Sequence, residues 1–448
     1  MANDNRPLSP FTTRGGIRVP HRKNTAGAPS IIMPPPEKVI IPLQMHIGAP
    51  CNPTVAVGDK VKVGDVIGDS DAFVSAPIHA SVSGTVMKLG NIVMPAGNTV
   101  QTVEIESDGL MEKRETEPPK VENVADFLKA VRASGLVGLG GAGFPAAVKL
   151  KVPDTAHVDT LIVNAAECEP YITSDNRCII EDSWDVLSGI YAVKDILGVH
   201  SVLIGIEANK PDAIDLLSRM AYNDVRDPNN EVRVVKLKTD YPQGAEKMLI
   251  RACTGRVVPA GGLPSDAGCV VMNVTSIAFL STYLKTGMPL VSKRITVDGS
   301  AVGRPCNVIV PIGTRICDVM EFVGGYRKLP KKILMGGPMM GQTIPSDEIP
   351  VVKNTNAVLA FTEDEAILPE EDACIRCGNC AYNCPMGLMP MTLAQAAVRG
   401  DHEALDKGCV MACIECGSCS FVCPAHRSVT QRIRLGKVLM KERQATKK

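Results

Sequence analysis

The sequence lacks an excess of charge, a long apolar run and an apolar leader. Lys+Arg and Asp+Glu both number 48, so the formal net charge is zero, whereas proteins that bind mainly nucleic acid usually carry a basic excess. No apolar run of about 18 residues is present, which argues against a transmembrane helix. Residues 1–10 contain no apolar core of a secretory signal. We therefore expect a cytosolic chain that does not act on nucleic acid.

The length and the composition predict several globular domains. A chain of 448 residues with 45% hydrophobic and 21% charged residues suits about three domains and argues against disorder. Changes in pattern divide it into an arm, a β unit, an α/β domain, a second β domain, a cysteine-rich helical domain and a basic tail, over residues 1–36, 37–110, 120–290, 291–362, 363–430 and 431–448.

The α/β domain is predicted from alternating apolar runs and helical periodicity. Residues 160–164 and 201–206 are buried-strand runs, and residues 124–134, 210–221 and 243–253 have helical patterns. A parallel sheet flanked by helices is the simplest fold for this order. The units on either side show short β-branched runs separated by Gly-Asp turns, typical of β structure.

Sixteen cysteines are distributed unevenly, and nine of them lie between Cys374 and Cys423. In a reducing compartment such a cluster indicates metal binding rather than disulfides. Residues 374–385 and 413–424 both have the spacing C-x2-C-x2-C-x3-C-P, which is that of two-cluster ferredoxins. Zinc would instead favour paired C-x2-C units without a third cysteine.

In this motif three thiolates bind one [4Fe–4S] cluster and the fourth binds the other cluster. The predicted metal ligands are therefore Cys374, Cys377, Cys380 and Cys423 for the first cluster, and Cys413, Cys416, Cys419 and Cys384 for the second. The linker between the two runs has helical patterns, which favours a helical ferredoxin. Cys409 is interpreted as a buried spare thiol.

A glycine-rich loop at residues 138–143 formally matches GxGxxG. A helix rather than a strand precedes it and Pro145 follows it, so it does not fit the usual dinucleotide-binding fingerprint. Bare glycine amides can nevertheless approach a phosphate or a flavin ring, and Lys149 could balance an anionic charge. Glu167 and Glu169 follow the strand at 160–164, at the edge where α/β sheets bind ligands; a solvated loop is the alternative.

Residues 138–149, 164–170 and 273–276 resemble the FMN- and NADH-binding subunit of respiratory NADH dehydrogenases. Nearly the whole chain, including residues 15–23, 75–86 and 241–247, is similar to the RnfC family of the Rnf electron-transport complex. The resemblance implies a barrel-sandwich hybrid, a Rossmann-like FMN/NADH-binding α/β domain, a β-grasp soluble-ligand-binding domain and an α-helical two-cluster ferredoxin.

The resemblance also implies a function and a set of contacts. The family is peripheral, lies on the cytoplasmic face of the cell membrane, and carries FMN and two [4Fe–4S] clusters. It exchanges electrons with NAD(H) in a membrane complex that couples NADH and ferredoxin chemistry to Na⁺ or H⁺ transport, so the other Rnf subunits are the implied partners. The implied FMN contacts are Gly138, Gly140, Gly141, Lys149, Asn164, Glu167, Gly244 and Asn273; the implied NADH contacts are Phe144, Glu169, Tyr241 and Glu246.

Three positions depart from the respiratory pattern. Leu139, Ala166 and Ala245 stand where an arginine, an aspartate and a glutamate are usual, which indicates a less polar flavin pocket. The first β unit resembles lipoyl and biotinyl carriers, but the expected position falls near Phe73 and its hairpin has no lysine. We therefore expect no covalent lipoyl or biotinyl group, and a structural role for His79.

Two further segments have competing interpretations. The Gly-Gly-Pro-Met-Met-Gly motif at residues 336–341 is interpreted as a tight turn with core methionines rather than a phosphate loop. The basic residues after Ala425 are interpreted as a solvated, frayed helix, with an end that lies on anionic lipid or an acidic partner as the alternative.

The predicted function is an electron-transfer subunit, and no catalytic Ser-His-Asp or Cys-His set is visible. Cofactors supply the chemistry of such a protein, and the chain supplies their positions. The alternatives are a soluble NADH-dependent flavin and iron–sulfur reductase, such as a corrinoid reductase, or a cluster-bearing adaptor without catalysis. The barrel-sandwich pattern before the flavin domain favours the Rnf interpretation over the reductase.

Overall fold

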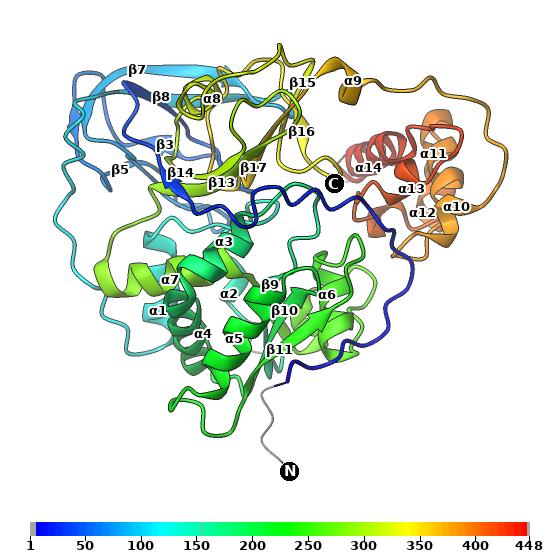
Figure 1. Ribbon diagram of the computed structural model, residues 1–448, viewed down its shortest axis with the longest axis horizontal. Helices are drawn as coiled ribbons and strands as arrows, with labels where there is room; N and C mark the ends of the chain where they lie inside the picture. The colour runs from blue at the N-terminus through cyan, green and yellow to red at the C-terminus, as the bar shows by residue number, and fades with distance from the viewer. Residues whose placement is uncertain (1–5, 154, 446–448) are drawn as a thin grey trace.

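The computed structural model describes residues 6–153 and 155–445. Figure 1 shows an α/β unit in the lower half, β-rich units above it and a separate group of helices at the right. The expected multidomain combination of α/β, β-rich and helical parts is thereby confirmed. Within the described ranges, no helix is both long enough and apolar enough to cross a bilayer.

A four-stranded parallel sheet forms the centre of the α/β unit. Its order is β11 (Val232–Leu237), β10 (Ser201–Glu207), β9 (Thr160–Ala165) and β12 (Cys269–Asn273). The side chains of β9 and β12 are almost all buried, as in a sheet that is covered on both faces. The predicted parallel sheet is therefore confirmed.

Seven helices and one short 3-10 turn, η1 (Pro264–Ala267), accompany the described strands of this sheet. The helices are α1 (Val124–Ala133), α2 (Ala146–Leu150), α3 (Ser174–Glu181), α4 (Ser183–Leu197), α5 (Pro211–Tyr222), α6 (Glu246–Thr254) and α7 (Val274–Thr286). α1 and α5 match the predicted helices to within one residue at each end. α6 begins three residues later than predicted, because Gln243 and Ala245 donate their backbone N–H groups to a preceding turn.

The first β unit consists of two small sheets. One has the order β2 (Lys38–Pro42), β8 (Thr99–Ser107), β7 (Gly84–Val93) and β4 (Lys60–Val61), and the other β3 (Asn52–Pro53), β5 (Val66–Asp69) and β6 (Ile78–His79). Val39, Ile41, Val103 and Ile105 are completely buried between them. His79, expected to be structural, is also buried, and burial lowers its pKa to about 3.

The second β unit is a six-stranded mixed sheet. Its order is β1 (Ile31–Ile32), β14 (Cys306–Pro311), β13 (Ser292–Asp298), β17 (Ala357–Phe361), β15 (Lys332–Met335) and β16 (Gln342–Thr343). α8 (Ile316–Phe322) buries Ile316, Val319 and Met320 in the core of this unit. The edge strand β1 comes from the predicted arm, so the arm contributes to this sheet.

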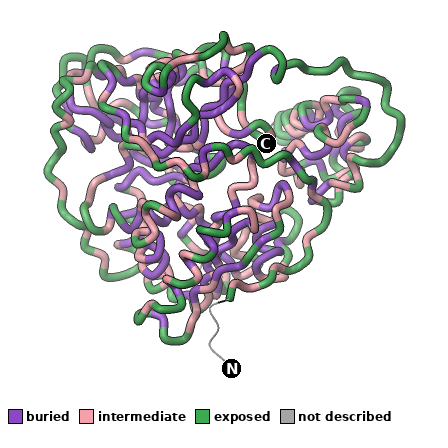
Figure 2. Tube along the Cα trace, in the orientation of Figure 1, coloured by how far each residue is buried: buried purple, intermediate pink, exposed green. Residues whose placement is uncertain are grey.

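The cysteine-rich part is helical, as predicted. After α9 (Glu363–Ala366) it contains α10 (Asn379–Tyr382), α11 (Pro390–Arg399), α12 (His402–Lys407), the short turn η2 (Val410–Ala412), α13 (Ser418–Phe421) and α14 (Val429–Ala445). Figure 2 shows that the segment leading into it is exposed, and Leu368 in that segment is 79% exposed. This linker therefore contributes little to the packing of the helices.

The interpretation of the basic tail as a solvated, frayed helix is wrong. α14 packs against α11 and buries Ile433 and Met440. Its Arg434 and Lys437 bind Glu415. The predicted boundary at residue 430 falls inside this helix, whose apolar face and charges are both used within the cysteine-rich part.

The N-terminal arm runs as an extended segment across the molecule, between the α/β unit and the cysteine-rich helices (Figure 1). Ile17 and Tyr241 exchange two backbone hydrogen bonds of 2.7 and 2.8 Å, and Gly16 donates its N–H to the Asn383 carbonyl at 3.1 Å. The arm therefore bridges two parts that are far apart in the sequence.

A completely buried lysine connects three units. The ammonium group of Lys353 donates to the carbonyl oxygens of Pro77, before β6, and Gly135, after α1, at 2.6 and 2.7 Å. Burial lowers the pKa of Lys353 to about 7. The lysine thus joins the first β unit to the α/β unit from a position in the second β unit.

We expect Lys353→Met to remove a pH-dependent part of the stability. The pKa of Lys353 is lower in the folded chain than its ordinary value of 10.5. The unfolded chain therefore binds more protons above about pH 7, and the stability from this group rises with pH. The unfolding temperature of the wild-type chain should rise relative to that of the variant between about pH 7 and 9. A constant difference over this range would contradict the assignment.

Candidate functional site

Two asparagines mark the carboxyl edge of the parallel sheet. Asn164 on β9 and Asn273 on β12 are paired in register. The Asn164 amide donates to the Gly244 carbonyl at 2.9 Å, and the Asn273 amide donates to Asp175 at 2.7 Å. The Asn273 side chain also accepts from the N–H groups of Thr275 and Ser276 and so caps α7. These bonds hold both asparagines in place.

The glycine loop lies against this edge. The N–H of Gly138 donates to the Phe144 carbonyl at 2.9 Å and closes the loop. A Cβ on Gly140 would lie 2.5 Å from Nδ2 of Asn273, whereas a Cβ on Gly141 would meet nothing within 4 Å. The loop therefore rests on the sheet edge at Gly140, and Gly141 leaves open space.

The position of Gly244 completes this group. A Cβ on Gly244 would lie 3.3 Å from the Cys168 sulfur and 3.7 Å from Oδ1 of Asn164. The neighbouring Gln243 is 5% exposed, and its Nε2 has no hydrogen-bond partner among the described residues. A buried donor without a partner is rare in proteins. It is consistent with a site that binds a polar ligand.

Lys149 and Glu246 form an ion pair beside these residues, with a separation of 2.6 Å. They come from α2 and α6, and about a third of each side chain is exposed. Phe144, just before α2, is half-buried. The structure thus brings together a residue predicted to contact FMN and one predicted to contact NADH, and the two neutralise each other.

The two predicted carboxylates bind backbone amides instead of facing solvent. Glu167 accepts from the N–H groups of Asp175 and Asn176 at 2.6 and 3.3 Å, at the start of α3. Glu169 accepts from those of Met339 and Met340 at 3.0 and 2.9 Å. Burial raises the pKa of each carboxyl group to about 7. The solvated-loop alternative is therefore wrong for both.

Two lysines hold the backbone of this loop. Lys23 of the arm donates to the carbonyls of Glu167, Glu169 and Ile172 at 2.8, 2.9 and 2.5 Å. Lys210 donates to the Ala166 carbonyl at 2.6 Å and pairs with Glu207 at 3.4 Å. Burial and repulsion from Lys210 lower the pKa of Lys23 to about 8. The sequence analysis did not identify either lysine as a site residue.

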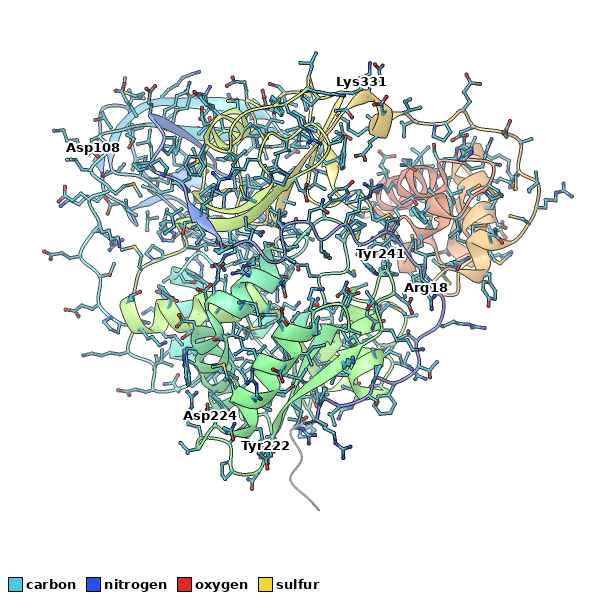
Figure 3. All side chains as sticks on the ribbon, in the orientation of Figure 1. Arg18, Asp108, Tyr222, Asp224, Tyr241 and Lys331 are labelled. Atoms are coloured by element: carbon cyan, nitrogen blue, oxygen red, sulfur yellow. The ribbon has the colours of Figure 1, made fainter. Side chains whose placement is uncertain are left out.

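Tyr241 lies at the boundary with the cysteine-rich helices rather than at the exposed edge. It is 1% exposed, and its hydroxyl donates to the Cys416 carbonyl at 2.8 Å. Figure 3 shows Tyr241 beside these helices, with Arg18 of the arm nearby. Ile17, Val19 and Cys416 surround it in a small apolar cluster. This contact connects the α/β unit directly to a predicted cluster ligand.

Four of the predicted ligands line one pocket. Cys384, Cys413, Cys416 and Cys419 surround a space of about 360 Å³ together with Ile414, Glu415 and Ile433. Burial raises the pKa of Cys419 to about 11, and repulsion from Cys416, Cys413 and Cys384 contributes. Among the described residues, no three Cys, His, Asp or Glu side chains converge as a site for a metal ion. Thiols spread around a pocket suit a multi-iron cluster, whose iron atoms each bind one thiolate.

The other four predicted ligands are more accessible. Cys374 and Cys377 are exposed, and Cys380 and Cys423 are half-buried. The two motifs fold alike, because Gly378 and Gly417 have φ of 79° and 81°, a conformation that glycine adopts without strain. Cys409 is exposed and does not line the pocket, so its interpretation as a buried thiol is wrong.

We expect Cys384→Ser to damage the cluster predicted to bind Cys413, Cys416 and Cys419, because its thiol lies in their pocket. Iron content should fall by up to half, and the EPR signal of one cluster should disappear. Cys409→Ser is the matched control and should leave both signals unchanged. Loss of the cluster bound by the first motif alone would contradict this ligand set.

Four family models match successive parts of the chain. The Nuo51 FMN-binding domain matches residues 131–282, and the RnfC barrel sandwich hybrid domain matches residues 11–110. The SLBB domain matches residues 294–343, and a 4Fe-4S dicluster domain matches residues 373–428. The glycine loop and both asparagines lie in the first match, and all eight predicted cluster ligands lie in the last.

Full-length relatives decide the family. The RnfC subunit of the proton-translocating ferredoxin:NAD(+) oxidoreductase complex of Clostridium ljungdahlii is 44% identical over 85% of this chain and 83% of its own. The RnfC subunit of the Na(+)-translocating ferredoxin:NAD(+) oxidoreductase complex of Acetobacterium woodii is 42% identical over 95% and 96%. The RnfC subunit of the ion-translocating oxidoreductase complex of Rhodobacter capsulatus is 40% identical over 98% and 85%. The chain belongs to the RnfC family.

The resemblance to the RnfC family predicted from the sequence is thereby confirmed, and FMN and 4Fe-4S clusters are the cofactors of its matched domains. A solved structure of an NAD+-reducing [NiFe]-hydrogenase in the air-oxidized state shares the fold of part of the chain. Its TM-score is 0.50 at 18% identity, over 71% of this chain and 63% of that chain.

Proposed function

We propose that this member of the RnfC family exchanges electrons between NAD(H) and FMN and relays them through two [4Fe–4S] clusters toward partner subunits and ferredoxin. It would act as a peripheral subunit on the cytoplasmic face of a membrane complex that translocates Na⁺ or H⁺. The names and domains of the relatives support this function. FMN supplies the conversion between a pair of electrons and single electrons.

The observation that carries the proposal is the direct contact between the FMN-binding match and the dicluster match. The hydroxyl of Tyr241, in the former, donates to the carbonyl of Cys416, in the latter, at 2.8 Å. A chain that only stored electrons in its clusters would have no need for this buried junction. The contact supports a route from the flavin site into the cysteine-rich helices.

The proposed flavin ligands are the eight implied by the resemblance. The residues present fit such a group: Gly140 and Gly141 leave room that side chains would fill, and the buried Gln243 Nε2 lacks a partner among the described residues. Asn164, Gly244 and Asn273 lie together at the sheet edge. Of the proposed NADH contacts, Phe144 and Glu246 lie beside this edge, and we propose that Lys149 leaves Glu246 to face the flavin phosphate.

The exposure of the cysteines supports an order for the two clusters. Cys416, of the second motif, is in contact with the flavin domain, whereas Cys374 and Cys377, of the first motif, are exposed. We therefore propose that electrons pass between the flavin site and the cluster held by Cys384, Cys413, Cys416 and Cys419. The cluster of Cys374, Cys377, Cys380 and Cys423 would exchange them with a partner subunit.

The finer fold assignments also belong to this proposal. The two small sheets of the first β unit suit a barrel-sandwich hybrid, and the parallel sheet suits a Rossmann-like domain. The mixed sheet with α8 suits a β-grasp domain, and α10 to α14 suit a helical ferredoxin. Phe73, at the position of a carrier lysine, is 66% exposed.

The test of the function is the reduction of the chain by NADH. After anaerobic reconstitution with FMN, iron and sulfide, NADH should bleach the flavin absorbance and then produce the EPR signals of reduced clusters. Copurification with membrane subunits tests the assembly. A reconstituted chain that holds clusters but is not bleached by NADH would support the adaptor alternative instead.

A glycine variant tests the flavin position. We expect Gly140→Ala to retain less FMN, because its Cβ would lie 2.5 Å from Asn273, whose side chain is held by α7 and Asp175. Gly27→Ala is the matched control, since a Cβ there meets nothing within 4 Å. Equal flavin content after equilibrium dialysis of both variants would contradict the assignment.

A further inference from the structure

The loop of residues 336–341 is a tight turn, as predicted, but its methionines do not fill a core. The Gly341 N–H donates to the Gly337 carbonyl at 2.8 Å and closes the turn. Met340 is 46% exposed, and Met339 packs at the boundary with the cysteine-rich helices. The turn therefore projects from the second β unit toward the other parts of the chain.

The backbone amides of this turn bind an anion, and that anion is a side chain of the chain itself. The N–H groups of Met339 and Met340 point at the two carboxylate oxygens of Glu169, at 3.0 and 2.9 Å. A Cβ on Gly337 would lie 2.3 Å from the same carboxylate. Glycine at 337 is thus what allows the carboxylate to approach. The alternative of a phosphate loop correctly anticipated anion binding but not the identity of the anion.

The opposite side of the turn rests on a predicted cluster loop. A Cβ on Gly417 would lie 3.0 Å from the Met339 carbonyl. Gly417 lies between Cys416 and Cys419, and the Tyr241 hydroxyl holds the Cys416 carbonyl from the α/β side. The loop around Cys416 is therefore supported at two points, by Tyr241 and by the turn that Glu169 holds.

The position of Glu169 is itself fixed on the flavin side. Its own carbonyl accepts from Lys23, and the sulfur of the preceding Cys168 accepts from the N–H of Gly244, a proposed flavin contact, at 3.4 Å. A short segment of backbone thus connects the flavin site to the turn. Because both carboxylate oxygens already accept hydrogen bonds, the carboxylate has an occupation other than NADH.

We propose that Glu169 is a positioning residue, which holds the turn of residues 336–341 against the loop around Cys416 and so fixes the second cluster relative to the flavin site. This inference rests on the proposed function. It departs from the NADH contact that the resemblance implies for Glu169. Electron transfer slows steeply as two redox centres move apart, so a loose turn slows the step between them and spares the reduction of the flavin.

The experiment compares two variants that release the turn in different ways. Glu169→Gln replaces one acceptor oxygen with an NH₂ group that faces a backbone N–H, and Gly337→Ala displaces the carboxylate without removing it. Glu348→Gln, whose exposed side chain pairs with Arg315 in the same β unit, and Gly27→Ala are the matched controls.

The first measurement needs no cofactor. Hydrogen exchange of the Met339 and Met340 amides should accelerate about tenfold or more in both variants, the factor expected for loss of a hydrogen bond to a charged group. Neither control should change it. Unchanged exchange in both variants would overturn the proposal whatever their redox behaviour.

The second measurement separates the two roles of Glu169 by stopped flow and freeze-quench EPR with NADH. We expect flavin bleaching with the wild-type rate and dependence on NADH concentration, followed by a several-fold slower appearance of the reduced-cluster signals. Weaker bleaching by NADH, with clusters that follow the flavin as fast as in the wild type, would overturn the proposal and restore the NADH contact. If NADH does not bleach even the wild-type chain, the proposed function fails, and hydrogen exchange still decides whether Glu169 holds the turn.

Discussion

The docking of the cysteine-rich helices on the α/β unit depends on the backbone pairing between Ile17 and Tyr241. The covalent linker to these helices is exposed and contributes little packing. The arm supplies what the linker lacks, because it pairs with Tyr241 on one side and with Asn383 on the other. Ile17 and Val19 are buried in the same place. The relative position of the two candidate cofactor sites is therefore determined by a segment at the other end of the chain.

A second constraint is the set of buried charges behind the sheet edge. Burial of a charged group is costly unless hydrogen bonds or opposite charges compensate it. Lys23 meets this requirement with three carbonyl groups, and Lys210 with a carbonyl and Glu207. These bonds fix the backbone between β9 and α3. They also explain how an arm residue shapes a loop about 150 residues away, which no local sequence pattern reveals.

The features predicted well are those in which all the information is local. The repeated cysteine spacing, the helices α1 and α5 and the apolar strands β9 and β10 each depend on a few neighbouring residues, since helices and strands have fixed periodicities. The tail and Cys409 were predicted wrongly for the opposite reason. Whether a basic helix is solvated depends on its neighbours, here α11 and Glu415, and a spare thiol has no periodicity that indicates its exposure.

The sequence by itself determined the family, the types of cofactor and the segments that carry the candidate ligands, because motif spacing and apolar periodicity are properties of short stretches. Only the tertiary structure decided what each side chain touches. Position after β9 identified Glu167 and Glu169 as site candidates, but their amide partners come from α3 and from the second β unit. Tyr241 likewise meets a cysteine loop rather than the open edge. Hydrogen bonds between residues distant in the chain depend on how whole units pack, and that packing has no local signature.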